Sequence, residues 1–198
     1  MKILCVGRNY VNHAKEMNSP VPKKPLLFIK PASSLAKSLH DMPIPTFTQN
    51  LHYEAEWVLK IGKECSSLHT ENALEHIESM TVGIDLTARD LQSELKKKGH
   101  PWEIAKSWDG AALIGSFIPF SPTVSFDLKI NDRIVQNGSS DDMIFSIEDI
   151  LCYATQYFSL QKGDLIFTGT PEGVGPIQSG DKLEAQLEGK NVLSASFK

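Results

Sequence analysis

Cysteine is scarce in this sequence, and its placement argues against a fold held together by disulfides. The 198 residues contain three cysteines, Cys5, Cys65 and Cys152, which lie far apart and form no Cys-x-x-Cys pair. An odd number of widely spaced cysteines is not the pattern of a disulfide framework. It indicates a protein of a reducing compartment.

Long hydrophobic runs are also missing. No stretch approaches the ~18 consecutive apolar residues of a membrane-spanning helix. The apolar start of the chain ends at Gly7 and is too short for the core of a signal peptide. We therefore expect no membrane partner, and a cytoplasmic location or an organelle matrix after processing.

Charge of one sign does not accumulate either. The net charge is −4, and the only basic cluster, Lys96 to Lys98, precedes Gly99. The solvated C-terminal end of a helix explains such a cluster. A nucleic-acid partner would require a broad basic face, so we expect none.

What is present is ordinary globular composition, with 41% hydrophobic and 22% charged residues. The length suits one sizeable core, so we expect a single domain over residues 1–198. The patterns predict strands at 3–6, 26–29, 52–61, 80–84, 164–168, 182–187 and 192–197, a hairpin over 124–136, and helices over 70–79, 87–98 and 146–158. This order predicts an α+β fold with an antiparallel or mixed sheet rolled into a barrel and a few peripheral helices.

The segment 52–61 has the clearest pattern. Apolar residues from Tyr53 to Ile61 alternate with a second set that includes Glu54 and Glu56. Period two puts both carboxylates on one face of the strand, with α-carbons roughly 6–7 Å apart. Asp85 ends another predicted strand and could complete the set. A solvated sheet face would show the same glutamate spacing, whereas three converging carboxylates would favour a hard cation such as Mg²⁺ or Mn²⁺.

Six blocks in order give the sequence a family resemblance. They are GRNYVNHAKEM, LLFIKP, LHYEAEWVLKIGK, VGIDLTARDLQ, KKKGHPWEIAKSWDG and DLIFTGTPEGVGP. Together they resemble the fumarylacetoacetate hydrolase family, above all its short acylpyruvase and oxaloacetate decarboxylase branch. The resemblance implies the mixed β-roll of that family, a homodimer, and a catalytic domain without the extra N-terminal domain of larger relatives.

The resemblance also implies roles for single residues. It implies a metal, Mg²⁺ or Mn²⁺, held by Glu54, Glu56 and Asp85. Lys106 resembles the catalytic lysine of the family. The residues implied in substrate binding are Arg8, Lys30, Arg89, Gln92 and Thr170. From the sequence alone, Lys106 could equally be a surface lysine, Arg89 a partner of Asp90 or Glu94 on the helix surface, and Thr170 an ordinary turn residue.

His13 and Glu16 stand three residues apart, which places them on one face of a helical turn. A carboxylate behind a histidine holds one tautomer and raises its basicity, although surface pairs share this spacing. In the resembling branch this pair activates water and belongs to a mobile lid. The proline-rich residues 19–25 fit a flexible lid over about residues 10–25.

The implied function is metal-dependent cleavage of the C–C bond of acylpyruvates to pyruvate and a carboxylic acid, with decarboxylation of oxaloacetate at the same site. The substrate is then a small 2-oxo acid. Two alternatives stay open. One is an oxaloacetate tautomerase, or an isomerase or decarboxylase of 2-oxo acids from aromatic catabolism; the other is a non-catalytic metal-binding domain. Nucleotide binding through TGTPEGVG is disfavoured because the Lys-Ser/Thr ending of a P-loop is missing.

Overall fold

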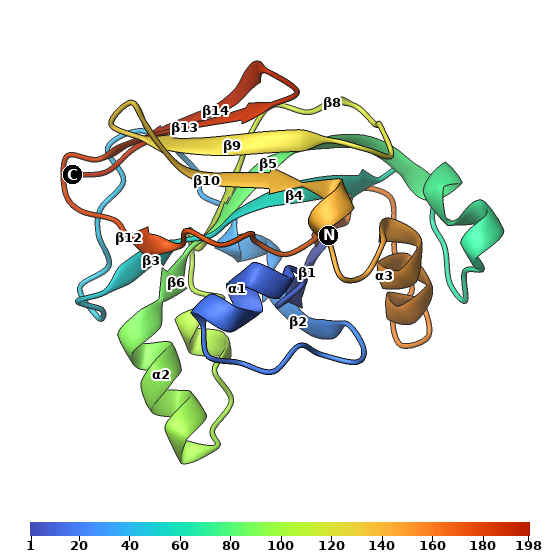
Figure 1. The fold of residues 1–198 in the computed structure, drawn as a ribbon, viewed down its shortest axis with the longest axis horizontal. Coiled ribbons are helices and arrows are strands. Elements are labelled where there is room, and N and C mark those ends of the chain that lie inside the picture. Colours follow the sequence, from blue (N-terminus) through green and yellow to red (C-terminus); the bar gives the residue numbers. More distant parts are fainter.

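The computed structural model describes residues 1–198 and has a strand-rich α+β fold with few helices, as predicted (Figure 1). Three α-helices lie at the periphery: α1 (Val11–Glu16), α2 (Arg89–Lys98) and α3 (Ile147–Ala154). Four short 3-10 helices are η1 (Ala32–Ser34), η2 (Thr70–His76), η3 (Glu103–Ala105) and η4 (Ser140–Asp142). In Figure 1, α2 projects from the body of the molecule, away from the sheets. None of the helices combines the length and the apolar composition of a membrane-spanning segment.

The largest sheet is mixed. Its strands are, in spatial order, β2 (Leu26–Pro31), β1 (Lys2–Gly7), β11 (Leu165–Phe167), β4 (Ala55–Ile61), β5 (Ile77–Asp85) and β7 (Ala112–Ile114), with β8 (Ile118–Pro119) also paired to β5. β1 and β11 pair in parallel, and the other neighbours are antiparallel. The sheet therefore joins the N-terminal strands β1 and β2 to strands from the middle of the chain and to β11.

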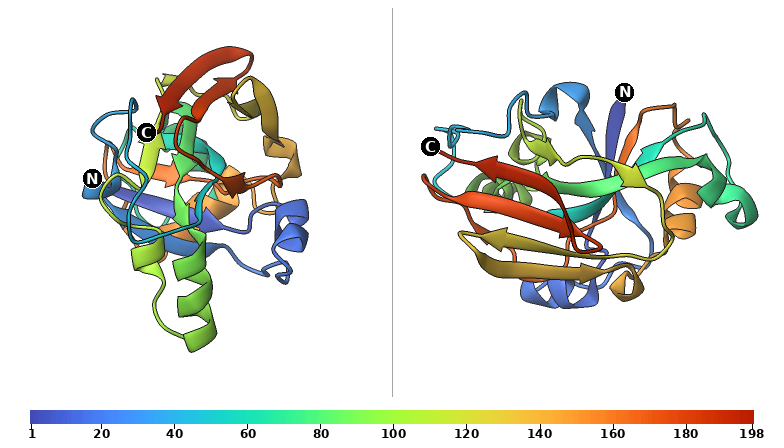
Figure 2. Two further views of the ribbon diagram at one scale, coloured as in Figure 1. Left: turned by 90° about the vertical axis from the view of Figure 1, so that its left-hand side faces the viewer. Right: turned by 90° about the horizontal axis from the view of Figure 1, so that it is seen from above.

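A second, four-stranded sheet packs against the largest sheet. It contains β10 (Arg133–Ser139), β9 (Ser125–Ile130), β13 (Lys182–Leu187) and β14 (Lys190–Ser196), which lie side by side in Figure 2, right. Trp57 of β4, Leu128 of β9 and Leu183 of β13 belong to one buried cluster between the two sheets. A small third sheet holds β12 (Gly175–Pro176), β3 (Leu51–Tyr53) and β6 (Thr87–Ala88).

The strand predicted over 52–61 exists, but its burial differs from the prediction. It breaks at Glu54 into β3 and β4, and both faces of β4 are buried. Trp57 faces the main core, whereas Val58 belongs to a second buried cluster with Ile3 and Phe167. The alternation of apolar and polar residues predicted a strand with one packed face. The second face is also buried, because residues distant in the sequence, such as Ile3 and Phe167, pack against it.

Two predicted helices begin or end differently. Of the helix predicted over 70–79, only residues 70–76 are helical, as the 3-10 helix η2, and the chain then enters β5 at Ile77, which pairs with Ile61. The helix predicted from Thr87 begins at Arg89, because Thr87 pairs with His52 in the third sheet. Sheet pairing thus replaces a helix end in both places.

Other local signals are confirmed. Ser146 and Asp149 form the capping box that starts α3. The helix is shorter than predicted and ends at Ala154, before Phe158. Gly99 ends α2 with a left-handed backbone (φ 66°), and Asn131 and Asp132 form the predicted hairpin turn with positive φ.

Candidate functional site

Three buried carboxylates meet where β4 and β5 lie side by side. The Asp85 amide donates to the Glu54 carbonyl oxygen over 2.8 Å, which makes these residues cross-strand neighbours. Glu56 lies two residues further along, in β4. Glu54, Glu56 and Asp85 each place one carboxylate oxygen within 4.8 Å of the others. The set that the sequence suggested therefore converges.

Three cations surround these carboxylates. Lys106 donates from Nζ to Glu54 Oε2 (2.8 Å) and to Asp85 Oδ2 (2.6 Å). Arg89 donates to Glu54 Oε1 over 2.5 Å, so it is not the partner of Asp90 or Glu94 on the helix surface. Lys30 Nζ lies 2.7 Å from Asp85 Oδ1. The two oxygens of Glu54 and the two of Asp85 thus all face positive charge.

Glu56 differs electrostatically from Glu54. Burial raises the pKa of Glu54, but Lys106 and Arg89 outweigh that effect and hold it below its ordinary value. Burial lowers the pKa of Lys106, but Asp85 and Glu54 outweigh that effect and hold it above its ordinary value. Burial and the charges of Asp85 and Glu54 raise the pKa of Glu56 well above its ordinary value, and its one protein donor is the Gly169 amide at 2.7 Å.

The donor set fits a divalent ion. It consists of carboxylate oxygens alone, which are the ligands that Mg²⁺ and Mn²⁺ prefer. A cation between the three residues would offset the repulsion that burdens Glu56. Zn²⁺ sites usually include histidine or cysteine ligands, and none belongs to this cluster.

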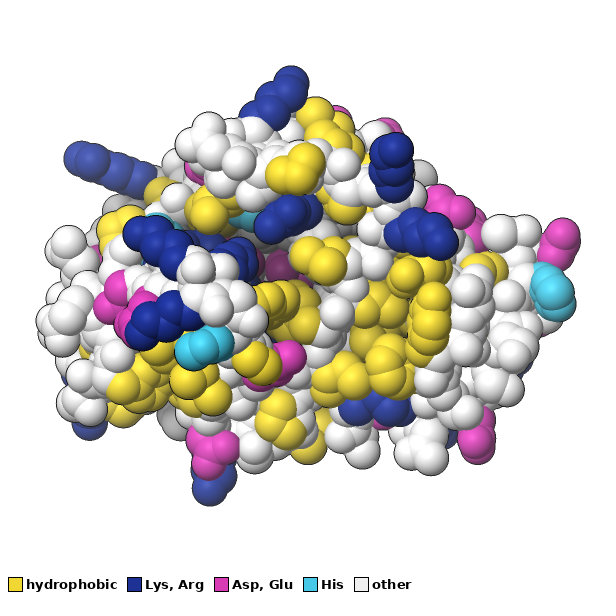
Figure 3. Space-filling view, turned by 90° about the horizontal axis from the view of Figure 1, so that it is seen from below, with side chains coloured by type: hydrophobic (Ala, Val, Ile, Leu, Met, Phe, Trp, Pro, Cys, Tyr) yellow, Lys and Arg dark blue, Asp and Glu magenta, His cyan; other side chains and the backbone are white.

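The carboxylates lie in a cavity of about 560 Å³. Its lining includes the predicted residues Arg8, His13, Arg89, Gln92, Lys106 and Thr170. Figure 3 shows a hollow on this side of the molecule, with Lys and Arg side chains along its edge and carboxylate atoms in its depth. Residues from the two ends and the middle of the sequence therefore share one site.

Lys30, for which the family resemblance implies substrate binding, is not among the residues that line this cavity. Its side chain is fully buried and, besides contacting Asp85, donates to the carbonyl oxygens of Lys106 and Ala111. The lysine therefore holds Asp85 and the segment of Lys106 in place. The FIKP motif therefore identified a residue next to the site, but the sequence did not show that Lys30 contacts Asp85 from outside the cavity.

His13 and Glu16 form the predicted pair on α1. His13 Nδ1 lies 3.2 Å from Glu16 Oε2, and His13 is buried at the cavity wall. Glu16 is exposed and accepts from the Gly173 amide over 3.1 Å, while Asn12 donates to Glu172 over 3.1 Å. These two bonds hold α1 against the loop that follows β11.

That loop contains Thr170, which is buried. Its conformation is stabilised by Gln136, a residue that was not predicted from the sequence. Gln136 of β10 donates to Thr170 Oγ1 (2.8 Å) and to the Pro171 carbonyl oxygen (3.0 Å), and accepts from the Ala55 amide (2.9 Å). Gly169 has φ 102°, and a Cβ there would lie 2.7 Å from Asn9 Cβ. A side chain at 169 would therefore disturb the amide that contacts Glu56.

Three further residues that line the cavity were not predicted from the sequence as site residues: Lys96, Trp102 and Phe28. Lys96 was explained by a solvated helix end. It is exposed, but it lies on the same face of α2 as Arg89 and Gln92. The i, i+3, i+7 spacing of these three residues was the available signal.

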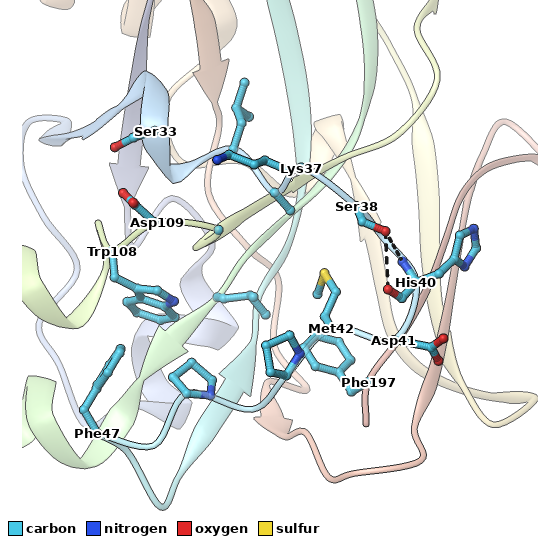
Figure 4. A pocket seen from close by; sticks show the side chains of 16 residues that line it. Ser33, Lys37, Ser38, His40, Asp41, Met42, Phe47, Trp108, Asp109 and Phe197 are labelled. Carbon is cyan, nitrogen blue, oxygen red and sulfur yellow. Dashed lines mark hydrogen bonds between the residues drawn. The ribbon is translucent and has the colours of Figure 1, made fainter.

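A second cavity, of about 490 Å³, is lined by residues that include Phe47, Trp108 and Asp109 (Figure 4). Phe47 and Trp108 meet there edge to face, with 5.4 Å between ring centroids. Lys30 Nζ, which contacts Asp85, lies 5.9 Å from the Trp108 ring centroid, so this cavity shares a wall residue with the surroundings of the carboxylates. The lining includes none of the three carboxylates. The first cavity is therefore the candidate active site.

Comparisons with known proteins agree with this arrangement. Residues 2–197 match the family model described as fumarylacetoacetate (FAA) hydrolase C-terminal. The chain is 39% identical to the mitochondrial oxaloacetate tautomerase FAHD1 of Bos taurus, over 99% of this chain and 90% of the relative. It is 38% identical to the oxaloacetate tautomerase YcgM of Escherichia coli, over 98% and 91%.

A solved structure shows the same fold. Fumarylpyruvate hydrolase from Pseudomonas aeruginosa, in complex with Mn²⁺ and pyruvate, superposes with a TM-score of 0.93 at 37% identity, over 100% of this chain and 89% of that chain. The match over nearly the whole length, with the α+β fold and the acidic cavity, leads to one conclusion: the chain belongs to the fumarylacetoacetate hydrolase family and is an enzyme of that superfamily.

Proposed function

We propose that the chain is a divalent-metal-dependent enzyme that acts next to the carbonyl of small 2-oxo acids, and that it hydrolyses acylpyruvates to pyruvate and a carboxylic acid. One observation carries this proposal: the carboxylate cluster of Glu54, Glu56 and Asp85 shares a cavity with His13, which is backed by Glu16. The cluster suits a cation, and the pair suits proton transfer.

The metal ligands of the proposal are Glu54, Glu56 and Asp85, and the ion is Mg²⁺ or Mn²⁺. When bound, such an ion supplies Lewis acidity that polarises the 2-oxo group. Support comes from the all-oxygen donor set and from the Mn²⁺ and pyruvate of the P. aeruginosa relative. Arg89 and Gln92, joined by a 2.9 Å hydrogen bond, orient the substrate.

His13 is the general base of the proposed hydrolysis. Its Nδ1 faces Glu16, which leaves Nε2 to take a proton from water. That water adds to the distal carbonyl, and the bond between C3 and the acyl carbon then breaks. The electron pair of that bond forms the enolate of pyruvate, Lys106 stabilises its charge, and the proton taken from water is returned to C3 to give pyruvate. With oxaloacetate the C4 carboxylate leaves as CO₂ without water, and the same enolate forms.

A second candidate is keto–enol tautomerisation of oxaloacetate. It is favoured by the names of relatives at 38% to 39% identity that match almost the whole chain. The reaction moves one proton between C3 and the 2-oxo oxygen. It passes through the enolate of oxaloacetate, which keeps the C4 carboxylate, and it needs a base but no water.

The experiment that separates these activities is a substrate panel. Pyruvate release from acetylpyruvate reports hydrolysis, pyruvate release from oxaloacetate reports decarboxylation, and the decay of enol absorbance in fresh oxaloacetate reports tautomerisation. Metal-dependent hydrolysis supports the first candidate. Metal-dependent loss of enol without pyruvate release supports the second and excludes the first.

Three further expectations belong to the same proposal. The chain forms a homodimer, it acts as a single domain with a lid over about residues 10–25, and it works in the cytoplasm. Sedimentation velocity tests the dimer, because a monomer at micromolar concentration contradicts it.

A further inference from the structure

Gln136 lies at a β-bulge of β10, beside the loop that follows β11. The pairing of β10 with β9 shifts register between Ile134 and Gln136. The loop packs directly on this bulge, because a Cβ at Gly173 would collide with the Val135 carbonyl oxygen. β-Bulges next to active sites commonly re-aim a side chain. Here the buried side chain of Gln136 bridges the loop and β4.

Only one orientation of the Gln136 side-chain amide satisfies the backbone groups around it. The Ala55 amide is a donor, so the atom that faces it over 2.9 Å must be Oε1. The Pro171 carbonyl oxygen is an acceptor, so the atom that faces it over 3.0 Å must be Nε2. The second proton of Nε2 is then donated to Thr170 Oγ1 over 2.8 Å.

This bond determines what the Thr170 hydroxyl can do. A hydroxyl has one proton to donate, and here its oxygen already accepts from Gln136, so the proton is left for another acceptor. Neither this proton nor the backbone amide of Thr170 has an acceptor in the protein. Thr170 is buried and lines the cavity of the three carboxylates. Buried donors normally have partners, so these two donors are suited to an oxygen of a ligand.

We propose that Gln136 is a positioning residue: by donating to Thr170 Oγ1, it fixes the Thr170 hydroxyl as a donor to an oxygen of the bound 2-oxo acid. This inference rests on the proposed function, which places a 2-oxo acid in the cavity. Gln136 does not line the cavity itself, so it acts on the ligand through Thr170. Without Nε2, the Pro171 carbonyl oxygen lacks its donor and the Thr170 hydroxyl loses the bond that fixes its rotation.

A double-mutant cycle tests this role without turnover. The probe is pyruvate, which is present with Mn²⁺ in the structure of the P. aeruginosa relative. The relaxation that protein-bound Mn²⁺ induces in the methyl protons of pyruvate measures its affinity. Gln136→Met should weaken pyruvate binding about tenfold, the size expected when one hydrogen bond to a charged ligand is lost. In Thr170→Val the same substitution should cause no further loss, because the hydroxyl through which Gln136 acts is already absent.

Two controls separate positioning from general damage. The Mn²⁺ affinity of Gln136→Met should stay close to that of the wild type, because Lys106 and Arg89 still hold Glu54. Gln156 is exposed and does not line the cavity, so Gln156→Met should leave pyruvate binding unchanged.

A second variant serves if Gln136→Met does not fold. Gln136→Glu has nearly the same size and keeps an acceptor for the Ala55 amide. Its carboxylate cannot donate to Thr170 Oγ1 and instead accepts the hydroxyl proton. Pyruvate binding should therefore fall again, and the loss should be smaller in Thr170→Val.

The outcomes separate this inference from the proposed function. Pyruvate affinity that is unchanged in Gln136→Met, or that falls equally in the Thr170→Val background, overturns the positioning role even where the enzyme turns over acetylpyruvate. A wild type that binds Mn²⁺ but no pyruvate overturns it as well. Pyruvate binding that depends on Gln136 only while the Thr170 hydroxyl is present, without turnover of any 2-oxo acid, supports the positioning role and overturns the proposed reaction.

Discussion

Lys106 and Asp85 form a buried ion pair, with 2.6 Å between Nζ and Oδ2, and the same ammonium lies 2.8 Å from Glu54. One lysine thus contacts two of the three proposed metal ligands. It offsets their charge, and it also stands where charge would develop on a substrate oxygen. The first prediction separates these two effects.

Lys106→Met should bind Mn²⁺ at least as tightly as the wild type, because the carboxylates lose a competing cation. Turnover should fall about 10²–10³-fold, because one electrostatic donor to the enolate is lost. Calorimetry and steady-state kinetics measure the two effects. Parallel loss of metal binding and turnover would show that Lys106 only maintains the geometry of the carboxylates.

Glu54→Gln should abolish metal binding with little change in side-chain volume. The wild type should be stabilised by Mn²⁺, by about 2.7 kcal/mol at a concentration 100 times the dissociation constant, and the variant should not respond. Thermal unfolding with Mn²⁺ and after chelation measures this. Glu64→Gln changes an exposed glutamate outside the cavity and serves as the control. A metal response that survives in Glu54→Gln refutes the ligand assignment.

His13→Ala should lower acylpyruvate hydrolysis about 10²–10⁴-fold, the range for loss of a general base. Metal binding should persist, since the proposed ligands are untouched. His69 is exposed, so His69→Ala is a control of the same chemistry. If the variant loses Mn²⁺ as strongly as activity, His13 supports the site and does not transfer protons.

The extent of sequence-based prediction differs from residue to residue. Three residues could be predicted from the sequence because strand periodicity and a strand end are local signals: Glu54, Glu56 and Asp85. The backbone pairing of β4 with β5 then brings them together. For Lys30 and Lys96 the sequence did not show which residues surround their side chains. Their environments depend on segments more than 70 residues away for Lys30 and on the return of the chain at Trp102 for Lys96. The contacts of Lys30 are tertiary and leave no local periodicity, whereas the spacing of Lys96 from Arg89 and Gln92 on α2 is a local signal.

A structural prediction concerns Asp164, which joins β1 to β11. It is buried, pairs with Lys2, and accepts from the amides of Lys2 (2.8 Å) and Gln161 (2.9 Å). In Asp164→Asn an NH₂ group replaces one of the two carboxylate oxygens, so that at least one of these donors loses its acceptor. The free energy of unfolding at pH 7 should fall by about 1–3 kcal/mol. Glu78→Gln alters an exposed pair with Lys60 and should have little effect.

The Asp164 effect should depend on pH. Burial raises the pKa of Asp164, but hydrogen bonds from Lys2 and Gln161 outweigh this and hold it below its ordinary value. A group whose pKa is lowered by folding stabilises the folded state above its unfolded pKa and loses that effect as pH falls through the folded pKa. Urea unfolding should therefore show a smaller difference between Asp164→Asn and wild type at pH 3 than at pH 7. A constant difference contradicts this electrostatic origin.

The central claim is that the carboxylate cluster holds a divalent ion that activates 2-oxo acids. Its most direct test follows product formation from acetylpyruvate and oxaloacetate with Mg²⁺, after chelation, and after Mg²⁺ is restored. Turnover of at least one substrate should disappear on chelation, return with the metal and be absent in Glu54→Gln. Turnover that persists without metal, or in Glu54→Gln, would contradict it.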